Sequence, residues 1–206
     1  MTLWIFGDKF VQPNNIQSQW MYKLAHELKC DIDSLAKNGT ALEFTYQRFN
    51  IARKKIKEYD TVIVSLTDFN RRWFFKQYPE FAELDKSPTD NKKETKAIEL
   101  FRKYLDHKEI YHTYLLDFLF NLQAISEDLK LHTIVLPCYE DVETFLADKR
   151  YLFPSIEIAD GNLSSLSGNN VEIILNHMNA DNHDILSKKL LAYIRDRTSV
   201  NLKEGF

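Results

Sequence analysis

Four short runs of apolar residues constrain the fold of this chain more than any other feature. They are TLWIF at 2–6, CDIDSLA at 30–36, DTVIVSL at 60–66 and LHTIVLP at 131–137. All except the run at 30–36 are apolar almost without interruption, which is typical of strands that are buried on both faces of a parallel sheet. Strands of this kind need a layer of helices on each side, and the runs therefore predict an α/β protein.

Helical patterns lie between these runs. Trp20, Leu24 and Leu28 recur every four residues, a longer series with helical spacing extends over 111–125, and a third lies at 186–194. Strand and helix alternating along a chain produce right-handed crossovers, with helices on both faces of one sheet. We therefore predict a three-layer α/β/α sandwich of flavodoxin-like architecture with a mostly parallel central sheet.

The length of 206 residues, with 44% hydrophobic residues, is enough for one substantial core. We predict a single domain over residues 1–206. Residues 139–170 have turn-rich composition and weak periodicity, so we expect them to be an excursion from the sheet. The charged stretch 83–96 is expected to be an exposed loop, and RRW at 71–73 the start of a helix with solvated arginines.

Composition excludes several classes of protein. No apolar run approaches the roughly 20 residues of a membrane span, and the N-terminus lacks a basic region followed by a long apolar one. We expect a soluble protein made in the cytoplasm. The formal charge of -3 lacks the basic footprint of a nucleic-acid binder. Cys30 and Cys138 fit neither a disulfide framework nor a metal pattern, and His107 and His112 do not share a helix face, so we expect no metal and no cofactor.

Ligands of open parallel sheets bind beyond the carboxyl ends of the strands. The segments at that edge are predicted to be 7–10, 36–40 and 65–72, together with the piece before the last helix. This last piece reads NHMNADNHDILSKKLL at 176–191, where an asparagine after the first histidine can cap the helix.

Four motifs in these segments, taken in order, resemble the SGNH/GDSL hydrolases. They are GD-x-F at the end of the first strand, L-x-x-N-G after the second (Leu35, Asn38, Gly39), a polar turn after the third (Ser65, Thr67, Asp68), and a late H-x-N-x-x-x-H-x-x-L (His177, Asn179, His183, Leu186). The phage-encoded branch is the most similar, because it opens with a WxFGDSF-like string and carries an NHL or NHM string before the final helix. The resemblance extends over nearly the whole chain.

This resemblance implies a site for ester hydrolysis. The family uses a serine in the GDS block, a late histidine as general base, usually an aspartate three positions earlier, and an oxyanion hole that stabilises the tetrahedral intermediate. Carried over by motif, Asp8 matches the GDS aspartate and His177 matches the base. Gly39, in the turn with Asn38, matches the oxyanion glycine, and Thr67 takes the place of the family's asparagine.

Two positions depart from the family pattern. Lys9 stands where the nucleophilic serine belongs, and Ile174 stands three positions before His177. In one interpretation the active site is retired and is inert or only binds. In another, Lys9 is functional, either as an amine of lowered pKa or as a cation for an anionic ligand, although the neighbouring Asp8 favours the charged ammonium.

A third interpretation moves the nucleophile to a residue such as Thr40, Ser65 or Thr67, or takes the motif to be misaligned. Our preferred hypothesis is a catalytically degenerate SGNH-hydrolase-like protein. By resemblance it is a phage-encoded structural or binding component, associated with a virion or tail, that contacts other proteins or surface glycan. The alternative is an active esterase acting on acylated carbohydrate, with His177 as base and a non-standard nucleophile. The many aromatic residues would mark a partner surface wherever they are exposed.

Overall fold

The computed structural model describes residues 1–8, 10–11, 19–72, 82–83, 96, 99–101, 103–166 and 178–205. Its strands are β1 (Thr2–Phe6), β2 (Asp31–Ser34), β3 (Thr61–Leu66), β4 (Arg71–Arg72), β5 (Ala82–Glu83), β6 (His132–Pro137) and β7 (Glu157–Ile158). Its helices are α1 (Trp20–Leu28), α2 (Leu42–Ala52), α4 (Lys108–Asp128), α5 (Glu140–Ala147) and α6 (Ala180–Asp196), with 3₁₀ turns η1 (Arg150–Leu152) and η2 (Leu163–Leu166).

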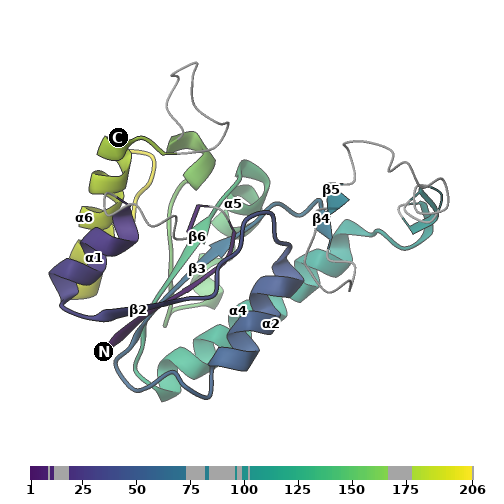
Figure 1. Cartoon of the computed structure of the whole chain (residues 1–206). Helices are drawn as coiled ribbons and strands as arrows, with labels where there is room; N and C mark the ends of the chain where they lie inside the picture. The colour runs from purple at the N-terminus through teal and green to yellow at the C-terminus, as the bar shows by residue number, and fades with distance from the viewer. Residues whose placement is uncertain are drawn as a thin grey trace.

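The central sheet has five strands in the order β2-β1-β3-β6-β7, and every neighbouring pair is parallel (Figure 1). At its middle, Ile63 of β3 pairs with Ile5 on one side and with Ile134 on the other. All six residues of β3 are buried, as expected of a strand with a helical layer on each face. The predicted parallel sheet is confirmed.

Side chains that alternate along each strand supply two separate cores. Leu3 and Ile5 belong to the core on the face of α1 and α6, whereas Trp4 and Phe6 belong to the core on the face of α2 and α4. Figure 1 shows α1 beside α6 and α2 beside α4. The predicted three-layer α/β/α sandwich is thus confirmed.

Part of the stretch 139–170 stays with the sheet instead of leaving it. β7 pairs with β6 as the edge strand, and Asp160 then forms a parallel bridge with Asn201. A strand of two residues is too short to produce a periodic signal, which is why the sequence did not indicate it. Residues 167–170 lie outside the described part of the chain.

The expectation for RRW at 71–73 was wrong in its described part. Arg71 and Arg72 form strand β4, antiparallel to β5, and are only 8% and 6% exposed. Each guanidinium has a carboxylate partner, and this partner offsets the free energy that is lost when an arginine is removed from water. Most of the expected loop at 83–96 lies outside the described residues.

Two general absences hold for the described residues alone. None of their helices combines the length and the apolar character needed to cross a membrane. Within the same residues, no group of three or more His, Cys, Asp or Glu side chains is placed to hold a metal ion.

Candidate functional site

Asp8 is the centre of a buried polar cluster at the carboxyl edge of the sheet. Its side chain is fully buried, just beyond the end of β1. The oxygen Oδ1 accepts from the backbone N–H of Phe10 at 3.2 Å and from Ser65 Oγ at 3.4 Å. The oxygen Oδ2 accepts from Thr67 Oγ1 at 3.3 Å and from Arg71 Nη1 at 3.1 Å. The carboxylate therefore has a charged partner and several hydrogen bonds in place of water.

Arg71 connects this carboxylate to the strand end of β6. Its Nη2 donates to the Tyr139 hydroxyl at 2.8 Å, and its Cζ lies 5.4 Å from the centroid of the Tyr139 ring. Burial raises the pKa of Tyr139, so this hydroxyl stays protonated at neutral pH. The Arg71 guanidinium therefore contacts the Asp8 carboxylate, the Tyr139 hydroxyl and the face of the Tyr139 ring.

Cys138 completes the cluster without being a nucleophile. Its Sγ donates to Asp8 Oδ1 at 3.6 Å, and the side chain is fully buried. Burial, together with the Asp8 charge, raises the pKa of the Cys138 thiol well above its ordinary value. Because the thiolate is the reactive form, this thiol is inert.

Gly7 allows the chain to bring Asp8 under Ser65. Its φ is +135°, and an added Cβ would lie 2.1 Å from Ser65 Oγ and 2.7 Å from Ser65 O. The Gly7 carbonyl accepts from the backbone N–H of Lys37 at 3.0 Å and from Thr40 Oγ1 at 3.2 Å. These bonds attach the turn after β2 to the segment after β1.

The structure brings several of the predicted site residues to this edge. Thr67 contacts Asp8 directly, and Gly39 lies in the turn that Thr40 ties to Gly7, with a φ of +74°. Asn38 is exposed in the same turn. Lys9, Ile174 and His177 lie outside the described residues.

The late motif is described only from residue 178 onward. Asn179 caps α6, since its side chain accepts from the backbone N–H of Asn182 at 2.7 Å. The Nδ1 of His183 accepts from the backbone N–H of Trp20 at 3.4 Å. The start of α6 is thereby fixed to the start of α1.

The sequence analysis did not assign two residues of the cluster to the site. Tyr139 follows β6 by two positions, so the rule that ligands bind beyond strand ends would have found it had it been applied to that strand. Arg71 belongs to the segment 65–72 that was predicted at the carboxyl edge, but two adjacent arginines usually lie in solvent, and nothing in the sequence indicated that it is buried with a partner.

Comparison with known proteins identifies the architecture. No family model and no curated protein sequence matches the chain. Among solved structures, it is similar to a carbohydrate esterase whose active site displays divergent catalytic and non-catalytic binding functions, with a TM-score of 0.54 and 12% identity over 95% of this chain and 68% of that one.

Two further structures show the same likeness. A protein of the G-D-S-L family from Desulfitobacterium hafniense DCB-2 has a TM-score of 0.50 at 12% identity, over 94% of this chain and 98% of that one. The acetyl xylan esterase Est2A from Butyrivibrio proteoclasticus has a TM-score of 0.52 at 12% identity, over 95% of this chain and 64% of that one. Identities this low show the fold alone: the chain has the three-layer fold of the SGNH/GDSL-type esterases.

Proposed function

We propose that this chain is a catalytically degenerate protein of the SGNH-hydrolase fold, in which the former active site serves structure or binding. Lys9 occupies the position of the family's serine, and Ile174 the position of its acid. A lysine has no hydroxyl, so the acyl-enzyme ester of the family route cannot form at this position.

The observation that carries the proposal is the state of the three nearby hydroxyl residues. A nucleophile must approach within about 3–3.5 Å of the reacting atom. Thr40 and Ser65 have no exposed surface, and Thr67 is only 4% exposed. Thr40 bonds the Gly7 carbonyl, while Ser65 and Thr67 bond the Asp8 carboxylate. None of the three is presented to a substrate, which argues against a shifted nucleophile.

We further propose that the protein is a phage-encoded component, associated with a virion or tail, that contacts other proteins or surface glycan. The support for this placement is the sequence resemblance alone. It consists of the opening string WIFGDKF and the NHM string before the last helix. In such a role the buried cluster around Asp8 holds the strand ends in place, and the protein does not need to hydrolyse an ester.

The second candidate is an active esterase on acylated carbohydrate, with His177 as its base and a non-standard nucleophile. The observation in its favour is the likeness of the fold to carbohydrate esterases. The retained Gly7–Asp8 edge and the Gly39 turn are consistent with it, because they supply backbone geometry of the kind that an oxyanion hole uses.

Turnover of p-nitrophenyl acetate separates the two functions. We would measure it for the natural protein and for Lys9→Ser, each with and without His177→Ala, and for Lys54→Ser as the control for loss of an exposed lysine. We expect no sustained turnover by the natural protein, because the family nucleophile is missing, and His177-dependent turnover by Lys9→Ser.

Acetylation of lysine itself would release at most one equivalent of p-nitrophenol per modified amine, so only the sustained rate is scored. Sustained, His177-dependent turnover by the natural protein would overturn the proposal and favour the esterase. Lys54→Ser should behave as the natural protein does.

A further inference from the structure

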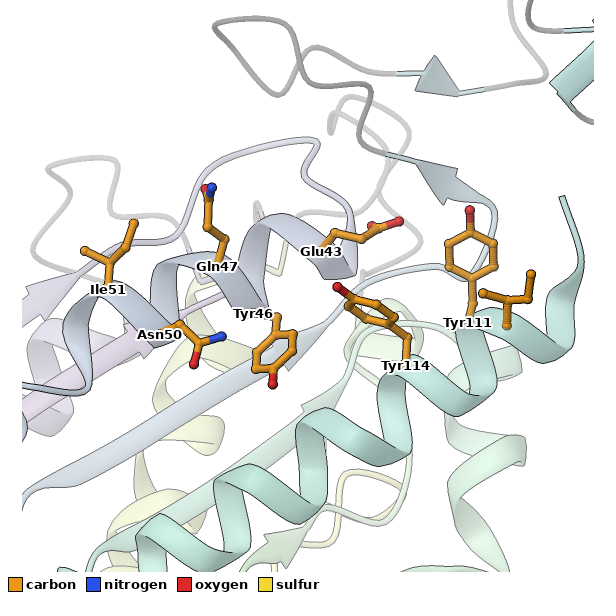
Figure 2. Close-up of a pocket in the computed structure, with 8 residues that line it drawn as sticks. Glu43, Tyr46, Gln47, Asn50, Ile51, Tyr111 and Tyr114 are labelled. Carbon is orange, nitrogen blue, oxygen red and sulfur yellow. The ribbon is translucent and has the colours of Figure 1, made fainter. Parts of the chain in front are cut away.

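A groove of about 630 Å³ lies between α2 and α4, and no role described above uses it. Its lining combines three tyrosines, one carboxylate, two carboxamides and two isoleucines: Tyr46, Tyr111, Tyr114, Glu43, Gln47, Asn50, Ile51 and Ile110. Figure 2 shows these side chains projecting from the two helices. The mixture of aromatic rings and planar polar groups is the type of lining that fixes a small ligand in a defined orientation.

Tyr114 presents an aromatic ring to solvent on a fixed support. It is 42% exposed, although the next residue, Leu115, is buried in the core. The Tyr46 ring beneath it lies 5.9 Å away in an edge-to-face arrangement. Tyr46 is in turn held by Phe118 at 4.9 Å and by Asn121 Nδ2, which donates to its hydroxyl at 3.2 Å. The ring therefore rests on side chains that are already held in place, and a ligand that stacks on it would cost little side-chain entropy.

Glu43 has an acceptor oxygen that the described residues leave unused. It lies in the first turn of α2, and its carboxylate is directed toward Tyr111 (Figure 2). The oxygen Oε2 is buried and has no hydrogen-bond partner among the described residues. Burial raises the pKa of Glu43. A buried acceptor without a donor is costly, but Oε2 is closed to water and to a ligand alike, so Glu43 contributes charge and not a hydrogen bond to the groove.

The charges at this end of the groove exclude an anionic ligand and disfavour a cage for a cation. The Arg72 guanidinium is paired with Asp106 at 2.6 Å, and its Cζ lies 3.3 Å from the centroid of the Tyr111 ring. One face of Tyr111 is therefore already occupied by a cation. Among the described residues that line the groove, the charged group is the carboxylate of Glu43, which repels anions.

We propose that the groove between α2 and α4 binds a neutral saccharide, with a pyranose ring over Tyr114 and its hydroxyls on Gln47 and Asn50. A pyranose has an apolar C–H face and a rim of hydroxyl groups, which match an exposed aromatic ring bordered by acceptors and donors. A carboxamide can both donate to and accept from a hydroxyl. The proposal does not depend on whether the Asp8 site turns over esters.

The groove adjoins that site through a single short strand. Arg72, over Tyr111, is the residue after Arg71, which holds Asp8. α2 follows β2 and therefore begins on the side of the sheet where that strand ends.

Isothermal titration calorimetry of the natural protein with cellotetraose, xylotetraose and chitotetraose tests the proposal. We expect at least one to bind with a dissociation constant of millimolar order or tighter. Tyr114→Ala should weaken this binding roughly tenfold, because stacking on an exposed ring is lost. Gln47→Ala should weaken it less, because the Asn50 carboxamide remains for the ligand hydroxyls. Tyr151→Ala, a tyrosine 78% exposed in η1, is the matched control and should change nothing.

Three results would overturn the proposal: no binding of any of the three saccharides, unchanged binding by Tyr114→Ala, or binding of tetramethylammonium in their place. Far-ultraviolet circular dichroism of each variant shows that it is folded, and both substituted side chains lie at the groove surface. The measurement involves no ester turnover, so an absence of saccharide binding would leave the proposed function unaffected. Ester turnover by the natural protein would likewise leave the proposed saccharide binding unaffected.

Discussion

At the scale of single residues, Asp8 shows what a buried carboxylate requires from its surroundings. Removing a carboxylate from water costs several kcal/mol, and the cost is recovered only with a charged partner and well-placed donors. Asp8 has Arg71 as that partner and Ser65, Thr67 and a backbone N–H as donors. The cluster therefore stabilises the edge of the sheet only while it is complete.

Asp8→Asn should be strongly destabilising. The substitution leaves the Arg71 guanidinium buried without a counter-charge, a change that typically costs about 3–5 kcal/mol. Urea unfolding followed by tryptophan fluorescence measures the loss. Asp184→Asn is the control, because its partner Lys188 is exposed and its partner Lys23 is partly exposed, and such surface pairs contribute about 1 kcal/mol or less. Equal losses in the two variants would show that the buried pair is not the anchor of this edge.

The sequence indicated some members of this cluster and not others. Asp8 and Thr67 follow strands with strong apolar patterns, so the strand-end rule and the family motif both reach them. Arg71 lies in the segment 65–72 that the strand-end rule also reaches, but its burial and its pairing with Asp8 became visible only in the structure. Whether Lys9 and His177 meet at this edge stays a prediction.

At the scale of elements, the turn after β1 depends on the close approach of two backbones. Gly7 lies against Ser65 of β3, with a φ that side chains rarely adopt. Because β1 and β3 leave no space for a Cβ here, the position requires glycine. The same turn carries Asp8 to its donors.

Gly7→Ala should lose several kcal/mol of stability. The added Cβ would meet Ser65 Oγ at 2.1 Å and Ser65 O at 2.7 Å, so both strand ends must move. Gly205→Ala is the control, because its φ is also positive, at +75°, but its nearest neighbour is Lys189 Nζ at 3.9 Å. There only the conformational cost of about 1–2 kcal/mol applies. Thermal unfolding that ranks Gly205→Ala as the more damaging would refute the packing argument.

The long elements could be predicted and the short ones could not. β1, β3 and β6 match the apolar runs to within one residue, because burial on both faces leaves a continuous signal. β4, β5 and β7 have two residues each, and pairing across the sheet rather than periodicity creates them. The two buried arginines of β4 show how tertiary partners override a local preference for solvent.

At the scale of the whole molecule, the C-terminal segment closes the sheet edge beside β7. Val200 and Leu202 are each 1% exposed, and the backbone N–H of Val200 donates to Glu157 Oε1 at 2.7 Å. Leu202 packs on Gly161, whose added Cβ would lie 2.9 Å from the Leu202 Cβ. The segment joins the described part of the stretch 139–170 to the core on the face of α1 and α6, and the single domain stays a prediction.

Leu202→Ala should destabilise the whole protein by about 2–5 kcal/mol, as other buried leucines do, and should leave one cooperative transition. Urea curves from tryptophan fluorescence and from far-ultraviolet circular dichroism should therefore coincide. Lys203→Ala, which removes only partly exposed ion pairs with Glu143 and Asp160, is the control. An early, separate loss of structure in Leu202→Ala would instead divide the chain into two folding units.

The consecutive arginines of β4 have a thermodynamic consequence. Arg71 is held by Asp8 at the strand ends, and Arg72 is held by Asp106 and the Tyr111 ring beside the groove. Because they share one backbone segment, a compound that displaces either guanidinium alters the free energy of the other contact. Occupancy of the two regions would then be linked, and linkage is reciprocal: each occupant changes the affinity of the other by the same factor.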